Sequence, residues 1–206
     1  SISGCAIAAD GTVFVGDSAR LDVWRVGADA SRPVVTLDHA IDALDCTARP
    51  RPRIALGVGP ALVVLPIGPD GTPDAARPDV VATGPDTFGK YVMVVAWSPD
   101  GTRIAAGIRD REVRVYDVAT RRLVGTPVSL GGTPRSILWS AAGGALVIAD
   151  TDSVTLCDAD TGTKFDEVRP GWKVTAIALE DAPGGGLVIA GGNGDGRLLR
   201  LPFARE

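Results

Sequence analysis

Short apolar segments separated by turn residues run along the whole chain, and residues 92–118 contain the clearest example. Val92–Trp97 is a run of large apolar residues, and Asp100-Gly101 is typical of a hairpin turn. Ile104–Gly107 is small and apolar, and Val113–Tyr116 alternates between apolar and polar residues. This pattern predicts short strands joined by tight turns. Because no long stretch has a helical period, we expect almost no helix.

The segment after the first of these turns recurs five times. The copies begin at residues 13, 54, 104, 146 and 187 and read VFVG, IALG, IAAG, LVIA and LVIA. Their starts are 41, 50, 42 and 41 residues apart, and a spacing of about 40–45 residues is the period of a β-propeller blade. Wholly apolar segments fit central strands that neighbouring blades cover on both faces. The final Gly or Ala of each copy would let adjacent blades approach closely.

Further apolar segments flank each copy, which gives four strands per repeat and three in the fifth. The predicted fold class is therefore all-β: a β-propeller of four-stranded antiparallel blades, with about five blades in this chain. We see no domain boundary and expect one propeller domain over residues 1–206. Its predicted blades lie approximately at 1–40, 41–84, 90–130, 136–169 and 173–206.

The widest spacing between copies contains an insertion at residues 66–90, with five prolines and four glycines. Because proline cannot donate a hydrogen bond to a central strand, this composition predicts an enlarged loop with at most an edge strand. The insertion interrupts the second blade without separating two cores.

Charge and composition narrow the choice of partner. The formal net charge of −4 argues against a nucleic-acid or anionic-membrane partner, and the apolar runs are too short to cross a bilayer. Arg supplies almost all positive charge, and together with abundant Ala, Val, Asp and Gly this suggests a bacterial source. The cysteines Cys5, Cys46 and Cys157 lie in apolar segments at unrelated spacings. We therefore expect buried small side chains and a reducing cytoplasm.

The third repeat resembles the WD-repeat β-propeller family. Residues 97–101, Trp-Ser-Pro-Asp-Gly, match the family's hairpin, and Asp110 lies six residues before Tyr116-Asp117, which stands where the family has Trp-Asp. Asp38-His39 resembles the family's Gly-His start signal. The other repeats are divergent: none has Gly-His or Trp-Asp, and the first and fourth lack the turn aspartate at the family's offset. The resemblance implies a propeller that binds proteins through the turns on one rim.

Propellers of this family more often close with seven blades than with five. The fifth repeat here stops after its third strand, at Leu201, and an open sheet edge would invite aggregation. We therefore expect a fragment of a longer protein whose remaining blades lie elsewhere, with completion by a partner strand as the alternative. A closed five-bladed ring would be the third arrangement.

Few residues suggest catalysis or metal binding. The single histidine, His39, excludes a multi-histidine metal centre, and no serine lies in a G-x-S-x-G sequence. Residues 158–162 (DADTG) and 191–196 (GGNGDG) superficially resemble calcium and phosphate loops, but their spacing fits ordinary turns between strands better. We therefore predict no catalytic residue, no cofactor and no metal, and we interpret His39 as a structural or loop residue.

Aromatic and arginine side chains provide the candidate binding surface. Trp97 and Trp139 end equivalent strands and, with Trp24, are expected in the core. Trp172 instead follows Pro170-Gly171 in the turn before the fifth repeat. The family resemblance places this kind of turn on one rim, and Arg and Trp are enriched in interface hot spots. The predicted partner-binding residues on that rim are Arg109, Arg111, Arg135, Trp172 and His39.

These observations predict a non-enzymatic protein-interaction scaffold or sensor, as a domain of a larger bacterial signalling protein. One alternative is a propeller enzyme of lactonase or quinoprotein type, for which the first strands offer only Asp42, Asp45 and Lys173 towards the central channel. Another is a small-ligand sensor that uses the mouth of that channel. The enzyme would need several acidic or histidine side chains converging on the channel.

Overall fold

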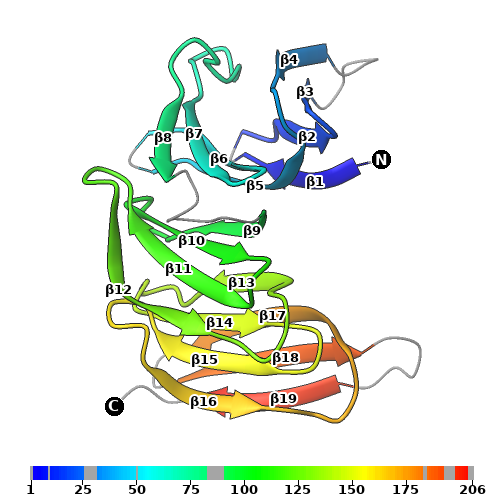
Figure 1. Ribbon diagram of the computed structural model, residues 1–206, viewed down its shortest axis with the longest axis vertical. Helices are drawn as coiled ribbons and strands as arrows, with labels where there is room; N and C mark the ends of the chain where they lie inside the picture. Colours follow the sequence, from blue (N-terminus) through cyan, green and yellow to red (C-terminus); the bar gives the residue numbers. More distant parts are fainter. Residues whose placement is uncertain are drawn as a thin grey trace.

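The computed structural model describes residues 2–8, 10–25, 32–49, 51–82, 91–182, 185–192 and 198–203. These residues form five antiparallel sheets, numbered here as sheets 1 to 5 in chain order, and in each sheet the strands follow one another in sequence. Figure 1 shows sheets 1 and 2 side by side at one end of the longest axis, sheet 3 in the middle, and sheets 4 and 5 together at the other end. The described residues therefore form an open arc.

The strands of each sheet are short and have the following bounds. Sheet 1 contains β1 (Ile2–Ile7), β2 (Val13–Asp17), β3 (Arg20–Trp24) and β4 (Arg32–Thr36). Sheet 2 contains β5 (Ile41–Thr47), β6 (Arg53–Val58), β7 (Ala61–Pro66) and β8 (Asp79–Ala82). Sheet 3 contains β9 (Val92–Trp97), β10 (Arg103–Ile108), β11 (Glu112–Asp117) and β12 (Arg122–Ser129). Sheet 4 contains β13 (Ser136–Trp139), β14 (Ala145–Ala149), β15 (Val154–Asp158) and β16 (Lys164–Val168). Sheet 5 contains β17 (Val174–Ala182), β18 (Gly185–Gly192) and β19 (Leu198–Phe203).

The predicted fold class is confirmed. The five recurring apolar segments are the second strands of the five sheets, and the described part of the chain contains no helix. None of its segments could therefore cross a membrane as an apolar helix. The insertion forms a loop that includes a bridge between Ile67 and Pro73 and ends in the outer strand β8. Residues 83–90 of the insertion lie outside the described residues.

Each pair of neighbouring sheets encloses one cluster of the core, and the second strands explain why. The first and third residues of the recurring segment face the preceding sheet, whereas the second and fourth face the following one. In sheet 3, Ile104 and Ala106 pack in the cluster shared with sheet 2, and Ala105 packs in the cluster shared with sheet 4. All five residues of β14 are buried for the same reason.

Glycine at the end of the segment permits this packing. A Cβ atom added at Gly16 would lie 2.9 Å from the Leu44 side chain, and one at Gly57 would lie 2.8 Å from the Val92 carbonyl oxygen. Both distances are shorter than carbon atoms tolerate. The predicted close approach of neighbouring blades is therefore present at these positions.

A backbone hydrogen bond recurs where the sheets meet. The N–H group at the start of a first strand donates to the preceding sheet's turn between its second and third strands. The distances are 2.6 Å from Ile41 to Ser18, 3.0 Å from Val92 to Gly59 and 3.0 Å from Val174 to Thr151. At the junction of sheets 3 and 4, Pro134 lies against Gly107 of sheet 3. It takes the place that Val92 has against Gly57 at the junction of sheets 2 and 3. Proline lacks the N–H group, so this hydrogen bond is missing between sheets 3 and 4. There the Thr126 N–H of β12 donates instead to the Thr161 carbonyl of sheet 4 at 3.0 Å.

Two of the junctions contain an Arg–Trp pair, which we define as Arg53 with Trp97 and Arg103 with Trp139. Each guanidinium lies over the indole of the next sheet, at 4.7 Å and 5.0 Å from the ring centroid. Each indole N–H donates to the preceding first strand, at 3.2 Å from Trp97 to the Asp45 carbonyl and 3.0 Å from Trp139 to Ala96. Both tryptophans are buried, as predicted. The pairs join consecutive sheets through stacking and hydrogen bonding together.

The first face of sheet 1 is not covered by any other described sheet. Val13 and Val15 are only half-buried, although their equivalents in sheets 2 to 4 are fully buried. Ile7 on the same face is 68% exposed. Two predictions of burial were wrong for this reason: Trp24 is 36% exposed and Cys5 is exposed, because both lie on this face.

The other two cysteines follow the prediction more closely. Cys157 is buried, and Cys46 is half-buried at the junction of sheets 1 and 2. Burial raises the pKa of Cys157 to about 12 and that of Cys46 to about 11. Neither thiol is therefore a reactive thiolate at neutral pH.

Candidate interaction rim

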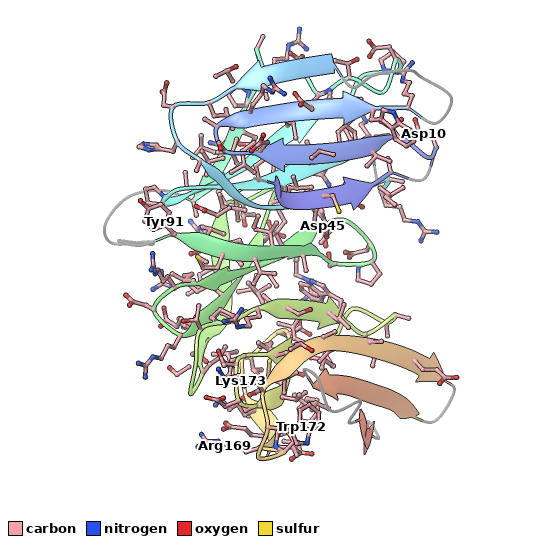
Figure 2. All side chains as sticks on the ribbon, turned by 90° about the vertical axis from the view of Figure 1, so that its right-hand side faces the viewer. Asp10, Asp45, Tyr91, Arg169, Trp172 and Lys173 are labelled. Atoms are coloured by element: carbon pink, nitrogen blue, oxygen red, sulfur yellow. The ribbon has the colours of Figure 1, made fainter. Side chains whose placement is uncertain are left out.

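The turns that carry the predicted binding residues share one rim because of the strand order. In an antiparallel sheet, the turn between the second and third strands lies at the same end as the entry to the first strand. Figure 2 shows the separation of the two ends, with Tyr91 on the left edge of the molecule and Asp10 on the right. We call the Tyr91 side, over sheets 3 to 5, the arginine rim, defined by Arg109, Arg111 and Arg135.

Arg109 and Arg111 lie together on the turn between β10 and β11, and both are exposed. The backbone N–H of Arg109 donates to the Tyr91 carbonyl at 3.1 Å, and its guanidinium lies 6.0 Å from the centroid of the Tyr91 ring. Arg111 has a φ of 65°, and its carbonyl accepts a hydrogen bond from Leu130 at 2.7 Å. The turn therefore holds two arginines beside an aromatic ring that is 47% exposed.

Arg135 lies at the entry to sheet 4, next to the turn between β14 and β15. Its Nε atom donates to the Thr151 hydroxyl at 3.3 Å, and the side chain is exposed. Asp150 organises this part of the rim from a buried position. Its carboxylate accepts hydrogen bonds from the backbone N–H groups of Gly132 at 2.8 Å and Ser153 at 2.7 Å. It thereby joins the entry of sheet 4 to the neighbouring turn.

Trp172 is half-buried rather than fully displayed. It packs against the apolar cluster shared by sheets 4 and 5, which includes Val147 and Val174. The neighbouring Lys173 is exposed, and Figure 2 shows Lys173 and Trp172 in the same part of the molecule as Arg169. The Arg169 guanidinium is paired with Glu167 at 2.8 Å. Trp172 therefore supports the last junction of the arc and exposes only part of its ring.

His39 belongs to a different sheet from the predicted arginines. It lies at the entry to sheet 2, where a Cβ atom added at Gly59 would lie 3.4 Å from the His39 Cβ. The side chain is exposed, but it belongs to the sheet 1–2 end of the arc. The structure therefore places Arg109, Arg111 and Arg135 on turns of sheets 3 and 4, and His39 on the same rim at the entry to sheet 2.

Tyr91 and Asp150 were not singled out from the sequence. Tyr91 directly precedes the first strand of sheet 3, so its place before a strand could have indicated a rim residue. The Asp150 carboxylate accepts hydrogen bonds from the backbone N–H groups of its own turn. The WD-repeat pattern places the turn aspartate one position later. An alignment that allowed a shift of one residue in the turn would have found it.

The acidic residues considered for a channel site have structural roles or lie apart. The Asp45 carboxylate accepts hydrogen bonds from the backbone N–H groups of Trp97 and Cys46, each at 2.8 Å. Burial raises the pKa of Asp45, although these hydrogen bonds act to lower it. Burial also raises the pKa of Asp42, and Arg109 opposes that effect. In the described residues, no three His, Cys, Asp or Glu side chains are grouped to hold a metal ion.

The calcium-like segment is the turn between β15 and β16. Its Asp158 carboxylate accepts hydrogen bonds from the backbone N–H groups of Asp160 at 2.9 Å and Thr161 at 2.8 Å. These bonds form an Asx turn, which explains the sequence without an ion. The glycine-rich segment continues past Gly192 into residues 193–197, which lie outside the described part of the chain.

The sheet order, junction packing and rim define a β-propeller arc with an exposed arginine rim. No protein-family model matches the chain. Coronin-7 of Rattus norvegicus is 33% identical over 117 residues, which cover 52% of this chain and 13% of the relative. Coronin-7 of Homo sapiens is 26% identical over 213 residues, covering 93% of this chain and 22% of the relative. The U5 small nuclear ribonucleoprotein 40 kDa protein of Pongo abelii is 49% identical over 37 residues, covering 18% of this chain and 10% of the relative.

These relatives are WD-repeat proteins and support a WD-repeat family for the chain. The chain spans less than a quarter of the full length of these Coronin-7 relatives. Two solved structures share the fold. A chain in the crystal structure of the Mitotic Checkpoint Complex has a TM-score of 0.76 at 14% identity, covering 96% of this chain and 61% of that one. The computationally designed Ika8 protein has a TM-score of 0.68 at 20% identity, covering 94% and 56%.

Proposed function

We propose that the chain is a non-enzymatic scaffold that binds a protein partner through the arginine rim. One observation carries this proposal: Arg109, Arg111 and Arg135 are exposed on neighbouring turns, and none of them forms an ion pair with another described residue. An exposed guanidinium that is not held in an ion pair keeps N–H donors available for a charge-assisted hydrogen bond. The WD-repeat relatives support a role in protein interaction.

The chemistry of the rim indicates the kind of partner. Guanidinium groups bind carboxylates in bidentate geometry, and the exposed Tyr91 ring adds apolar contact area. We therefore propose a protein with an acidic surface segment that also carries an apolar side chain. The formal net charge of −4 supports a protein partner rather than a nucleic acid, since nucleic-acid-binding domains usually carry a net positive charge.

The proposal is tested by comparing the wild type with three variants in pull-downs from a nuclease-treated lysate of the source organism. Arg109→Glu reverses one rim charge, and Arg111→Asn removes another while suiting the positive φ at that position. Arg122→Glu is the matched control, because Arg122 is an exposed arginine on β12 at the opposite rim. We expect quantitative mass spectrometry to recover a partner with the wild type and the control, reduced at least about tenfold in both rim variants. Equal recovery with all forms would refute this binding surface.

We further propose that the chain is a domain of a longer cytoplasmic signalling protein from a bacterium. The uncovered apolar face of sheet 1 supports this, because Ile7, Val13 and Val15 occupy places that are covered in sheets 2 to 4. The composition, rich in Arg and poor in Lys, supports the bacterial source. An intact-mass measurement on the protein isolated from its source checks the proposal. A product of 206 residues would contradict it.

A further inference from the structure

The junction between sheets 1 and 2 lacks the Arg–Trp pair that joins sheets 2 to 3 and 3 to 4. Thr12 stands where those junctions have arginine: its carbonyl accepts the Ala8 N–H at 2.8 Å, as the Arg103 carbonyl accepts the Ser98 N–H at 2.9 Å. Cys46 stands where they have tryptophan. It pairs with Ile54, and Trp97 pairs with Ile104, which is the equivalent residue of the next sheet. Two large side chains are thus replaced by two small ones.

A cavity of about 210 Å³ lies at this junction. Its walls come from the turn between β1 and β2 and from the turn between β5 and β6. In the next two junctions, the equivalent turns face each other across the arginine guanidinium, and Arg103 Nη2 donates to the Gly143 carbonyl at 2.6 Å. Arg53 makes the same contact with Gly101. The side chains that line the cavity from the two turns include Ala8, Thr12, Thr47, Ala48 and Pro52.

The insertion in sheet 2 forms the remaining wall. Ile67 and Pro69 line the cavity, and the loop is held in place by its own backbone. The Ile67 N–H donates to the Pro52 carbonyl at 2.9 Å, and the Gly68 N–H donates to Thr72 at 2.9 Å. A Cβ atom added at Gly71, where φ is +71°, would lie 3.4 Å from the Thr12 hydroxyl. The loop therefore reaches across to sheet 1 and forms one side of the cavity.

The opening of this cavity has an excess of negative charge. Asp10 lines the cavity, and Asp70 lies in the adjoining opening together with Arg25. A backbone hydrogen bond from Thr12 is the main cause that lowers the pKa of Asp10, and a side-chain hydrogen bond from Thr72 is the main cause for Asp70. Both carboxylates are therefore ionised at neutral pH. In the described residues that line the opening, Arg25 is the one cation facing two anions.

We propose that this cavity binds an arginine side chain of a protein partner. The apolar walls would contact the methylene groups, and the guanidinium would reach the carboxylate of Asp10 and the carbonyl groups of the facing turns. This places a foreign arginine where the chain's own arginine lies in the two following junctions. The cavity has room for it because Thr12, which lines the cavity, is smaller than the arginine at the equivalent position of the next two sheets.

The two proposed sites are independent of each other. Figure 2 shows Asp10 on the edge opposite to Tyr91, so the cavity and the arginine rim lie on opposite sides of the arc. The arginine rim is basic and would take an acidic partner, whereas the cavity is acidic and would take a basic side chain. A failure of either proposal leaves the other unaffected.

The test uses N-acetyl-L-arginine amide as the probe, because its only charge is the guanidinium. Binding to the full chain is followed by amide chemical shifts in NMR and by calorimetry. We expect a dissociation constant on the order of 1 mM for a molecule of this size, with shifts confined to residues of the two turns and the insertion loop. N-acetyl-L-citrulline amide has nearly the same shape without the charge, and we expect it to bind at least about tenfold more weakly.

Three variants locate the site. Thr12→Arg introduces the residue that the next two sheets have at this position, and it should abolish binding by filling the cavity. Asp10→Asn keeps the hydrogen bond to the Thr12 N–H and should weaken binding about tenfold, and it remains informative if Thr12→Arg fails to fold. Arg25→Ala removes the competing cation and should strengthen binding severalfold. The proposal is overturned if the wild type does not bind the probe, if citrulline amide binds equally, or if Asp10→Asn binds as the wild type does.

Discussion

The Arg–Trp pair between sheets 3 and 4 provides the sharpest test of how the arc is held together. Replacing Arg103 with Met keeps an unbranched apolar stem and removes the guanidinium with its charge. The Arg103 side chain is 17% exposed and contacts the Trp139 ring, the Gly143 carbonyl and Asp160. A largely desolvated cation over an indole contributes up to about 2 kcal/mol, and a hydrogen bond from a charged donor contributes about 1.5–3 kcal/mol. The ion pair with exposed Asp160 adds at most about 1 kcal/mol.

These contributions overlap, so we expect Arg103→Met to lower the free energy of unfolding by about 2–3 kcal/mol. The part that belongs to the pair is isolated by a double-mutant cycle with Trp139→Leu. Only the stacking is lost in both single variants, because the Gly143 and Asp160 contacts do not involve the indole. The expected coupling energy between Arg103 and Trp139 is therefore about 1–2 kcal/mol.

The measurement is urea unfolding followed by far-ultraviolet circular dichroism, because Trp139→Leu alters the fluorescence signal itself. The control cycle combines Trp139→Leu with Arg122→Met, since Arg122 is exposed on the outermost strand of sheet 3. That cycle should give a coupling energy within about 0.5 kcal/mol of zero. A coupling energy equally close to zero for Arg103 and Trp139 would refute the role of stacking at this junction.

Two further predictions concern packing and charge. Gly107→Ala should lower the free energy of unfolding by about 1–3 kcal/mol, because the new Cβ would lie 2.9 Å from the Pro134 side chain. Gly4→Ala is its control and should be neutral or stabilising by up to about 1 kcal/mol, since its Cβ would lie 3.4 Å from Leu44; equal losses in calorimetry would contradict the packing argument. Burial acts to raise the pKa of Asp100, but hydrogen bonds from Ser98 and Thr102 outweigh it and lower this pKa to about 2. Because the folded-state pKa is lowered, the ionised carboxylate stabilises the fold above pH about 4, and this contribution is lost as the pH falls towards 2. A shift of this size corresponds to at most about 2–3 kcal/mol, and screening at this exposed side chain reduces the expected loss in Asp100→Asn at pH 6 to about 1 kcal/mol. A difference between wild type and variant that stayed constant from pH 6 to pH 2 in urea unfolding would contradict this assignment.

The sequence was sufficient to predict the strands because the repeated segment carries information about both faces of a blade. In LVIA at 146–149, every residue is apolar and every residue is buried between two sheets. The Gly at the end of VFVG and IALG predicted close packing, and the added-Cβ distances at Gly16 and Gly57 show that close packing. Local composition and long-range packing agree at these positions, which is why the fold class followed from the pattern.

The errors occurred where burial depends on a neighbouring sheet. Trp24 and Cys5 lie in strands with the same composition as buried ones, so the sequence predicts burial for them. They are exposed because no other described sheet covers the first face of sheet 1. The candidate rim shows a related limit. The turns could be assigned to one rim from the strand order, but the half-buried packing of Trp172 depends on side chains of sheet 4.

The divergence of the repeats is itself informative about function. One position at the start of the second strand holds Thr12, Arg53, Arg103 and Ala145 in sheets 1 to 4. Where it is arginine, the facing residue of the next sheet is tryptophan, and the junction is closed. Where it is Thr12, the next sheet has Cys46 and a proline-rich insertion, and a cavity with an acidic opening remains. Loss of the pair and gain of the loop occur at the same junction. That coincidence is better explained by a binding site between blades than by relaxed packing, because relaxed packing alone would not require a hydrogen-bonded loop that reaches across to sheet 1.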